Sequence, residues 1–397
     1  MWRIPALFLF VTFAGRAESF LVLPFFNQTS KSNLDWMSES IAETIREALV
    51  SEGFITVSRE DRAEGYRRLS LRPYSVLTKA SVLKLGEELD AEQIVFGRFE
   101  FKDAPGAKGS RGTLRISAQI LNLHRVRSSP EVQTIGALED LASLQNQIAW
   151  QALKNALPEL ATSEAEFRKR RPSIRLDAME HYVRGLLAQK DEQKHYLFTQ
   201  AARLDPQFPQ PFFELGKMSW GKEDYRGAAD WLGRVNKSSG QYREATFLRG
   251  LSRFYLGDYA AAQMAFESVL DEVPMTEVQN NLGACQLRRG LPSALESFRK
   301  AKEDEPSDLD YLFNFAYALW RQGEFDESAA HLREILKRDP ADEQASLLLN
   351  RCQLRSPQRP GDPKTEGLER LKLEYNESVY LQLRSILTKQ KSGQDKK

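Results

Sequence analysis

The second half of the chain repeats one pattern roughly every 34 residues, and this period constrains the fold more than any other feature. Pro206, Gly240, Pro274, Pro306 and Pro340 are separated by 34, 34, 32 and 34 residues. Between these markers, small residues recur at two positions seven residues apart: Gly216, Gly250, Gly283 and Ala316 at the first, and Gly257, Gly290 and Gly323 at the second. A fixed period of this length indicates a stacked array of similar structural units.

Residues 243–274 show what one unit is expected to be. Apolar residues recur at helical spacing on both sides of Gly257 and Asp258, which predicts two helices joined by a tight turn. Gly250 in the first helix and Ala262 in the second are small enough to let the two helices approach. Pro274 ends the second helix because its ring clashes with the preceding turn and its nitrogen cannot donate a hydrogen bond.

These residues resemble the tetratricopeptide repeat family. Its pattern places Leu-Gly in the first helix, then Gly-Asp-Tyr at the turn, an alanine, an aromatic residue and a final Asp-Pro. The matching residues are Leu215-Gly216, Tyr225 and Ala228; Gly250, Gly257-Asp258-Tyr259, Ala262 and Phe266; Leu282-Gly283, Gly290, Ala294, Phe298 and Ala301; and Gly323, Phe325 and Asp339-Pro340. The resemblance implies an all-α solenoid of about five repeats over residues 175–355, of which the first, 175–206, is degenerate.

In that family the first helix of each repeat lines a concave face that binds partner proteins or peptides. By register from the small residues, the positions expected to point into this face are Phe213, Lys217, Phe247, Leu251, Asn281, Ala284, Phe313 and Tyr317. Exposed aromatic side chains in such a row suit an extended or helical peptide. Alternatively, they pack against neighbouring helices or against residues 365–390. Asn281 and Asn314 occupy equivalent positions and are suited to hold a peptide backbone or a carboxylate, although the lysines of a carboxylate clamp are missing.

The amino-terminal half, residues 18–160, reads as alternating strands and helices. Strands are predicted at 20–25, 54–57, 94–101 and 114–123, and helices at 36–49, 76–89 and 138–157. This order predicts an α/β domain with a mixed sheet, in which a hairpin crosses the glycine-rich loop 106–112. It resembles the amino-terminal domain of TolB through residues 22–25 with Asn27, 34–39, 94–97, 115–120, 144–145 and 148–149. The resemblance implies a bacterial interaction module without catalytic residues.

The remaining segments predict how the chain is exported and how it ends. Residues 1–17 combine Arg3, an apolar stretch and small residues at positions 15 and 17, which is typical of a secretory signal. We therefore expect a periplasmic or secreted protein without an integral membrane span after cleavage; a retained anchor helix is the alternative. Residues 161–174 and 356–365 read as linkers, 366–390 as an amphipathic helix and 391–397 as a disordered tail. That helix is expected to cap the array or fill its groove, with coiled-coil self-association as the alternative.

Little in the sequence indicates chemistry. The net charge of +1 and the lack of a basic stripe argue against nucleic-acid partners. None of the four histidines has a second ligand at metal-binding spacing, and no phosphate-binding motif follows a strand, so neither a metal nor a cofactor is expected. The leading prediction is a non-enzymatic scaffold that binds proteins or peptides on the concave face within a cell-envelope complex. Two alternatives remain: a sensory module whose α/β domain binds a small ligand, and an enzyme with an interdomain site.

Overall fold

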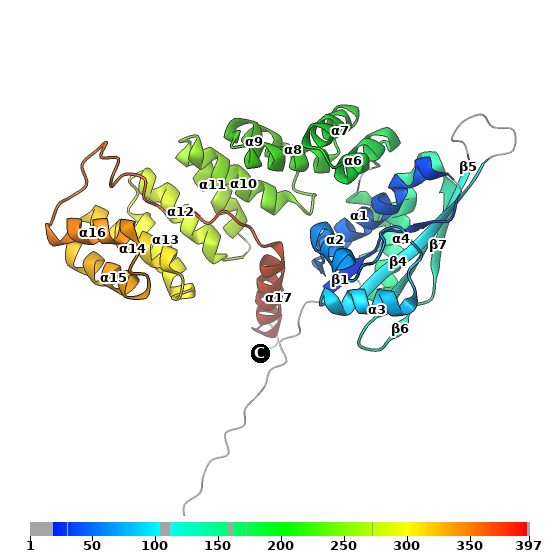
Figure 1. Cartoon of the computed structure of the whole chain (residues 1–397), viewed down its shortest axis with the longest axis horizontal. Helices are drawn as coiled ribbons and strands as arrows, with labels where there is room; N and C mark the ends of the chain where they lie inside the picture. Colours follow the sequence, from blue (N-terminus) through cyan, green and yellow to red (C-terminus); the bar gives the residue numbers. More distant parts are fainter. Residues whose placement is uncertain are drawn as a thin grey trace, which may run out of the picture.

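The computed structural model describes residues 19–394 except 30, 104–111, 158–161, 172 and 272, with side chains described up to residue 387. A mixed sheet flanked by helices is followed by a long run of paired helices (Figure 1). This confirms the predicted fold class, an α/β domain followed by an all-α solenoid. The predicted signal segment, residues 1–17, and most of the glycine-rich loop 106–112 lie outside the described residues.

The sheet is built around two long antiparallel strands. Strand β4 (Gln93–Asp103) pairs antiparallel with β5 (Gly112–Asn122), as the predicted hairpin requires. On one side β1 (Ser19–Val22) runs parallel to β4 and to β3 (Ile55–Thr56), and β2 (Phe26–Asn27) also pairs with β4. On the other side β6 (Arg127–Ser128) and β7 (Val132–Ala137) pair antiparallel with β5. The strand order is β3-β1-β4-β5-β6, with β2 beside β4 and β7 beside β5.

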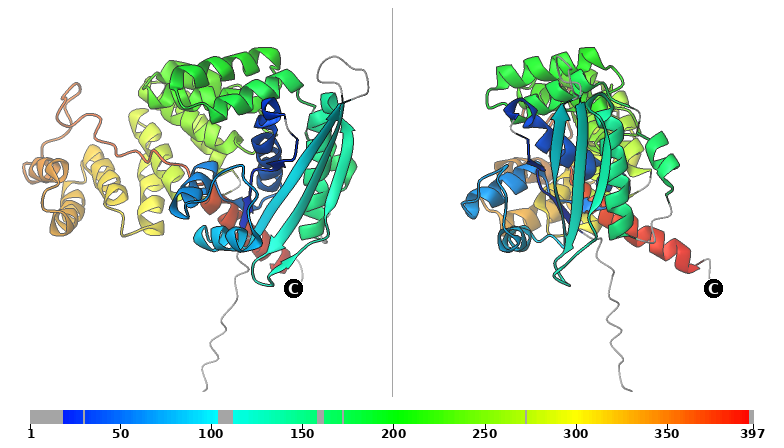
Figure 2. Two further views of the ribbon diagram at one scale, coloured as in Figure 1. Left: turned by 45° about the vertical axis from the view of Figure 1, so that its right-hand side comes forward. Right: turned by 90° about the vertical axis from the view of Figure 1, so that its right-hand side faces the viewer.

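Helices cover both faces of the sheet, because successive strand residues point to opposite sides. Phe20 and Val22 of β1 belong to a core that includes α1 (Trp36–Ser51) and α4 (Leu141–Ala156), whereas Leu21 lies in a second core with α2 (Arg59–Arg68) and α3 (Lys79–Glu88). Short 3-10 helices, Ser32–Leu34 and Leu138–Asp140, precede α1 and α4. The first core continues into the solenoid, where α1 contacts α6. Figure 2 shows the helices on the two sides of the sheet.

Helix α2 and strand β7 were not predicted. Helix α2 is almost entirely charged or polar, so it carries no hydrophobic period. It is attached through Arg62, which is 5% exposed and donates to Glu39 and to the Val22 carbonyl oxygen at 2.8 Å. Glu39 is 1% exposed, so this is a buried ion pair inside the α/β domain. The position of α2 is therefore set by contacts with β1 and α1, made to residues that lie 40 and 23 positions earlier in the sequence.

Among the described residues the solenoid contains five helix pairs and one final helix. The pairs are α6 (Leu176–Leu187) with α7 (Asp191–Leu204), α8 (Pro209–Gly221) with α9 (Tyr225–Leu232), α10 (Tyr242–Tyr255) with α11 (Tyr259–Leu270), α12 (Thr276–Arg288) with α13 (Ser293–Asp304), and α14 (Leu309–Gln322) with α15 (Phe325–Arg338); α16 (Glu343–Gln353) follows. The predicted linker 161–174 contains a short helix, α5 (Glu164–Lys169), which buries Phe167.

The small residues at the first position of the period lie where the two helices of a pair touch, whereas Gly257, Gly290 and Gly323 at the second position adopt the positive φ of the turn between the helices. A methyl group added at Gly216 would come within 2.5 Å of Leu232, and one added at Gly283 would come within 2.8 Å of Phe298. Both distances are shorter than carbon atoms tolerate, so a side chain there would require the facing side chain or its helix to move. Gly221, at the end of the same helix as Gly216, has no atom within 4 Å of its added methyl. The period therefore marks helix contacts at its first position and turns at its second.

The carboxy-terminal prediction is wrong in part. Helix α17 begins at Glu377 and extends to Gln394, into the predicted disordered tail, whereas residues 366–376, predicted to be helical, contain no helix. The predicted apolar stripe is divided as a result: Leu368 is buried in the non-helical part, while Val379 and Ile386 on α17 are 38% and 46% exposed. Figures 1 and 2 show this orange-to-red segment returning from α16 along the solenoid towards the α/β domain. Helix α17 contacts β3 there.

Candidate functional site

Over α10, α12 and α14, the side of the solenoid formed by the first helices is covered by the chain itself. We call residues 365–376 the strap; from residue 368 onward it has no regular secondary structure. It crosses the first helices of successive repeats, α12 and α14, and ends where α17 begins beside α10. The sequence predicts that the carboxy-terminal segment either caps the array or fills its groove, and in the structure the strap enters the groove.

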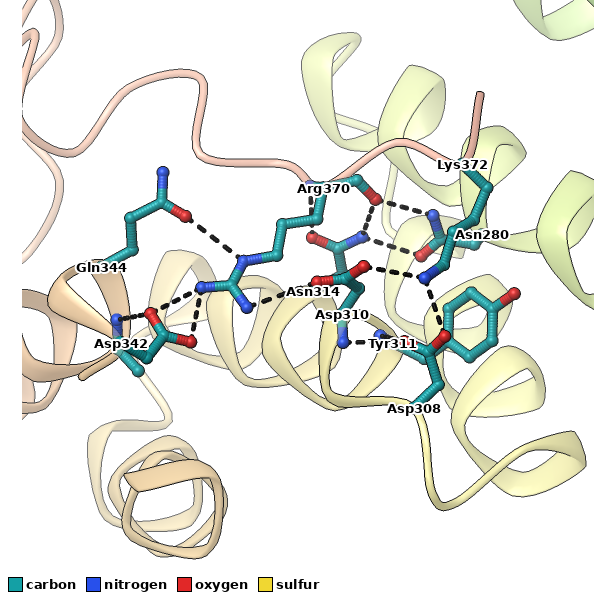
Figure 3. Close-up of polar contacts among 10 residues, drawn as sticks. Asn280, Asp308, Asp310, Tyr311, Asn314, Asp342, Gln344, Arg370 and Lys372 are labelled. Carbon is teal, nitrogen blue, oxygen red and sulfur yellow. Dashed lines mark hydrogen bonds and ion pairs between the residues drawn. The ribbon is translucent and has the colours of Figure 1, made fainter. Parts of the chain in front are cut away.

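Asparagine side chains hold the strap by its backbone. The Asn314 amide donates to the Arg370 carbonyl oxygen at 2.8 Å and accepts from the Arg370 N–H at 2.8 Å. Asn281 does the same for Lys372, at 2.7 and 2.9 Å, and Asn280 donates to the Arg370 oxygen at 2.9 Å. All three asparagines are fully buried. They satisfy the backbone of an extended segment as a neighbouring strand would. Figure 3 shows Asn280 and Asn314 at the backbone of Arg370.

Arg370 occupies a pocket that fits a guanidinium group. Two of its hydrogen bonds go to the two carboxylate oxygens of Asp342, both at 2.7 Å, and a third goes to Gln344 at 3.2 Å. The guanidinium carbon lies 3.8 Å from the centre of the Phe313 ring. Both bonds to Asp342 come from one terminal nitrogen, Nη2, while Nη1 donates to Asp310 at 3.4 Å. Three nitrogens of the guanidinium group are therefore used, and stacking on the Phe313 ring depends on its planar shape.

Lys372 occupies a second acidic pocket on the same side of the strap (Figure 3). Its ammonium group donates to Asp308 and to Asp310, both at 2.7 Å, and lies 4.8 Å from the centre of the Tyr311 ring. Arg370 and Lys372 are two residues apart, so an extended backbone places both side chains on one face. The groove therefore contacts a basic side chain at every second residue over this stretch.

The acidic pockets are formed by the ends of helices. Asp308 caps the amino terminus of α14 by accepting from the Asp310 and Tyr311 N–H groups, and Asp342 caps α16 by accepting from Ala345 at 2.9 Å. Each carboxylate thus serves both a helix end and a basic side chain of the strap. The two aspartates are 34 residues apart, in step with the repeat period.

Further contacts fix the two ends of the strap. Glu369, whose side chain is 1% exposed, pairs with Arg288 at 2.9 Å, and burial raises the pKa of Glu369. The Tyr317 hydroxyl donates to the Thr365 carbonyl oxygen at 2.8 Å. At the other end, the Tyr375 ring lies 5.6 Å from that of Phe247. Arg243 pairs with Glu377 at the start of α17 and stacks over Tyr380 at 4.4 Å.

The structure divides the predicted concave residues into three groups. Four contact the strap: Phe247, Asn281, Phe313 and Tyr317. Leu251 and Ala284 are fully buried among the helices, while Phe213 and Lys217 line a separate cavity. The expectation of exposed aromatic side chains is wrong, because Phe213 is 3% exposed and Phe247, Phe313 and Tyr317 are fully buried. The alternative that they pack against residues 365–390 holds for those that contact the strap.

Several residues of the groove were missed by the sequence analysis. They are Asn280, Asp308, Asp310, Asp342, Arg370 and Lys372. The spacing of Asp308 and Asp342 is a signal that was available in the sequence, because both follow a repeat-ending proline by two residues. Arg370 and Lys372 carried no such signal, since nothing in their local sequence indicates that they enter the groove.

The cavity beside the strap lies between the two halves of the chain. It has a volume of about 730 Å³ and is lined by α1, α2, α6, α8, α10 and the start of α17. Carboxylates dominate it: burial raises the pKa of Glu47 to about 7, and it also raises the pKa values of Glu214 and Glu244. Neither histidine nor cysteine is among the described residues that line it.

No catalytic or metal centre is evident in the part of the chain that the structure describes. Over those residues, no group of three or more histidine, cysteine, aspartate or glutamate side chains is arranged to bind a metal ion. Cys285 and Cys352 are free and buried, and burial raises the pKa of both thiols. Within the same residues, we find no helix with the length and apolar character needed to cross a bilayer.

The fold and the groove together define a helical-repeat protein whose concave face holds an extended segment. The tetratricopeptide repeat family model matches residues 247–308, 291–343 and 313–357. The helical half of the chain therefore carries tetratricopeptide repeats, as its period predicts, and proteins with such repeats are generally scaffolds for protein interactions.

Similar proteins cover parts of the chain. Sperm-associated antigen 1 of Rattus norvegicus is 29% identical over 122 residues, and that of Mus musculus is 27% identical over 122 residues. Each match covers 30% of this chain but only 14% of the relative.

Among solved structures, YrrB, described as a TPR protein with an unusual peptide-binding site, is 16% identical with a TM-score of 0.35, covering 49% of this chain and 97% of YrrB. MamA from Desulfovibrio magneticus RS-1 is 19% identical with a TM-score of 0.38, and the match covers 42% of this chain and 97% of the MamA chain. The LpoB carboxy-terminal domain from Escherichia coli is 19% identical with a TM-score of 0.24, and the match covers 30% of this chain and 82% of the LpoB chain.

Proposed function

We propose that this protein is an exported, non-enzymatic bacterial scaffold that binds extended segments of partner proteins in the concave groove, within a cell-envelope complex. One observation carries the proposal: Asn281 and Asn314 each form paired hydrogen bonds to the backbone of an extended segment. Such bonds give affinity for any extended chain, because they use groups that every residue except proline possesses. Pockets for alternate side chains then add selectivity.

The amino-terminal domain is assigned the role of a second interaction module. Its strand and helix order, together with residues 22–25 and 94–97, supports a TolB-like domain. The signal-like segment 1–17 supports export to the periplasm or beyond. The domain is packed against the repeats through α1 and α6. We therefore expect the two halves to act as one body that presents the groove and the sheet to different partners.

The sensory alternative has one observation in its favour, the 730 Å³ cavity between the two halves. A cavity of this size is in the range of small-molecule sites. Its carboxylates point to a cationic ligand. A ligand of that kind should raise the melting temperature of the full-length protein, and the rise should disappear in Glu214→Gln/Glu244→Gln.

Affinity capture from cell-envelope extract tests the scaffold proposal. The full-length protein is compared with Asn281→Ala/Asn314→Ala, which removes both backbone clamps, and with Asn350→Ala, the same change at an exposed position of α16. We expect wild type and Asn350→Ala to recover the same partners and the double variant to lose them. Equal recovery by all three proteins would refute binding through this groove. Fractionation of cells that produce the tagged full-length chain tests export.

A further inference from the structure

The face that the strap covers is suited to being open as well as filled. Beneath the strap lie the amides of Asn280, Asn281 and Asn314 and the carboxylates of the two acidic pockets. Water can hydrogen-bond to all of these groups when the strap leaves, so exposing them does not strand an unpaired polar group. The strap also covers the rings of Phe247, Phe313 and Tyr317, and aromatic side chains are enriched at the centre of protein-binding surfaces.

The strap itself resembles a bound peptide. The N–H groups of Arg370 and Lys372 bond to groove side chains and not to neighbouring backbone. Its two basic side chains remain partly exposed, Arg370 by 18% and Lys372 by 23%, and one of their partners, Asp310, by 41%. Its connection to α16 keeps the effective concentration of the strap at the groove high.

The pockets differ in what they accept. The Arg370 pocket places acceptors from Asp342, Asp310 and Gln344 around three different nitrogens of the guanidinium group. It also offers the Phe313 ring as a stacking face, and this arrangement fits a planar guanidinium better than a compact ammonium group. The Lys372 pocket presents carboxylate oxygens from two residues, which suits a compact ammonium group with several donors. Arg288, on the other side of the strap, pairs with the acidic residue that precedes the arginine.

From these contacts we infer that the groove between α12 and α16 selects partner segments with the order acidic, Arg, any residue, Lys, and that the strap is a tethered copy of this ligand, which the partner displaces. The inference deepens the proposed function and rests on it. The proposed occupant of the open groove is an extended segment of another protein. Exchange of straps between two copies of this chain would use the same contacts, and the experiment below distinguishes such a dimer from binding of another protein.

The test measures binding of a fluorescently labelled peptide with the sequence of residues 364–376 to the full-length protein by fluorescence anisotropy. The strap competes with the peptide in wild type. In Arg370→Ala/Lys372→Ala the strap is weakened but the groove is intact, so we expect the peptide to bind at least tenfold more tightly, a difference of about 1.4 kcal/mol. Adding Asp310→Asn/Asp342→Asn should abolish this gain. Asparagine is also a good helix cap, so α16 is expected to be preserved.

A second variant guards against a folding defect in the first. Arg243→Ala removes the anchor of the strap at Glu377 without altering either acidic pocket, and it should also tighten peptide binding. A control peptide in which both basic residues are alanine should bind either variant at least tenfold more weakly than the natural sequence. Melting curves check that each protein is folded.

Three results would overturn the inference. The first is peptide binding no tighter in either folded variant than in wild type. The second is equal affinity for the control peptide, which would leave the backbone clamp and the proposed function standing but remove the sequence preference. The third is that Arg370→Ala/Lys372→Ala or Arg243→Ala forms dimers that the peptide cannot dissociate. A second copy of the chain would then be the occupant of the groove. The capture experiment with the asparagine variants is independent of all three.

Discussion

Replacing Asn314 with alanine should release the strap. The substitution removes the two hydrogen bonds to the Arg370 backbone, at 2.8 Å each, while leaving the strap sequence unchanged. A hydrogen bond of this kind contributes about 1 kcal/mol net, so the closed state should lose about 2 kcal/mol. Because 1.4 kcal/mol corresponds to a factor of ten, the population with an open strap should rise roughly 30-fold.

Limited trypsin digestion measures this population directly, because Arg370 and Lys372 are themselves cleavage sites. When opening is fast compared with cleavage, the cleavage rate follows the open fraction. We therefore expect cleavage after these residues to be roughly 30-fold faster in Asn314→Ala than in wild type, and unchanged in the control Asn350→Ala. A change of less than about threefold, with the protein otherwise folded, would refute the assignment of Asn314 as a backbone clamp.

Three further predictions concern stability and are checked on the full-length protein. Gly216→Ala should destabilise the fold by about 1–3 kcal/mol in denaturant titrations, because the added methyl group overpacks the contact between α8 and α9. Glu39→Ala should cost about 3–5 kcal/mol, since it leaves a buried guanidinium without its partner. Glu47→Gln should change how stability depends on pH. Burial raises the folded-state pKa of Glu47 to about 7, so its stabilising contribution is complete below about pH 4.5 and is lost as pH rises through 7. The variant should match wild type at pH 5 and exceed its melting temperature at pH 8.

Matched controls accompany these predictions. Gly221→Ala, at the open end of the same helix as Gly216, should not be destabilising. Glu88→Ala removes the partially exposed pair with Arg68 and should cost less than about 1 kcal/mol. Equal decreases in the free energy of unfolding for Gly216→Ala and Gly221→Ala would contradict the packing argument. Equal decreases for Glu39→Ala and Glu88→Ala would contradict the argument from burial. A melting difference between Glu47→Gln and wild type that does not vary with pH would contradict the titration.

The repeat architecture could be predicted because its constraint is local and recurs. Each pair of helices requires a small residue at the contact and a turn a fixed distance later, so Gly216, Gly250 and Gly283 reveal it in the sequence. The longer strands, β4 and β5, were also predictable, since each contains several buried apolar residues that run together or alternate with polar ones. Strand β7 was not, because it is a short edge strand with only one fully buried residue, Thr134.

The strap could not be predicted for the opposite reason. Leu368, Leu371 and Tyr375 have helical spacing, and the charged residues between them are good helix formers, so local propensity favours a helix. Its extended conformation is imposed by Asn314 and Asn281, which precede their partners by 56 and 91 residues. Tertiary contacts of this range override local preference. The sequence therefore indicated the asparagines as backbone ligands but not the segment that they hold.

Hydrogen exchange at the amides of Arg370 and Lys372, in the full-length protein alone and with a captured partner, tests whether the strap fills the groove and whether a partner displaces it. We expect slow exchange in the free protein, where these amides bond to Asn314 and Asn281, and fast exchange once the partner fills the groove. Fast exchange in the free protein would contradict a groove filled by the strap. Slow exchange with the partner bound would contradict binding in this groove.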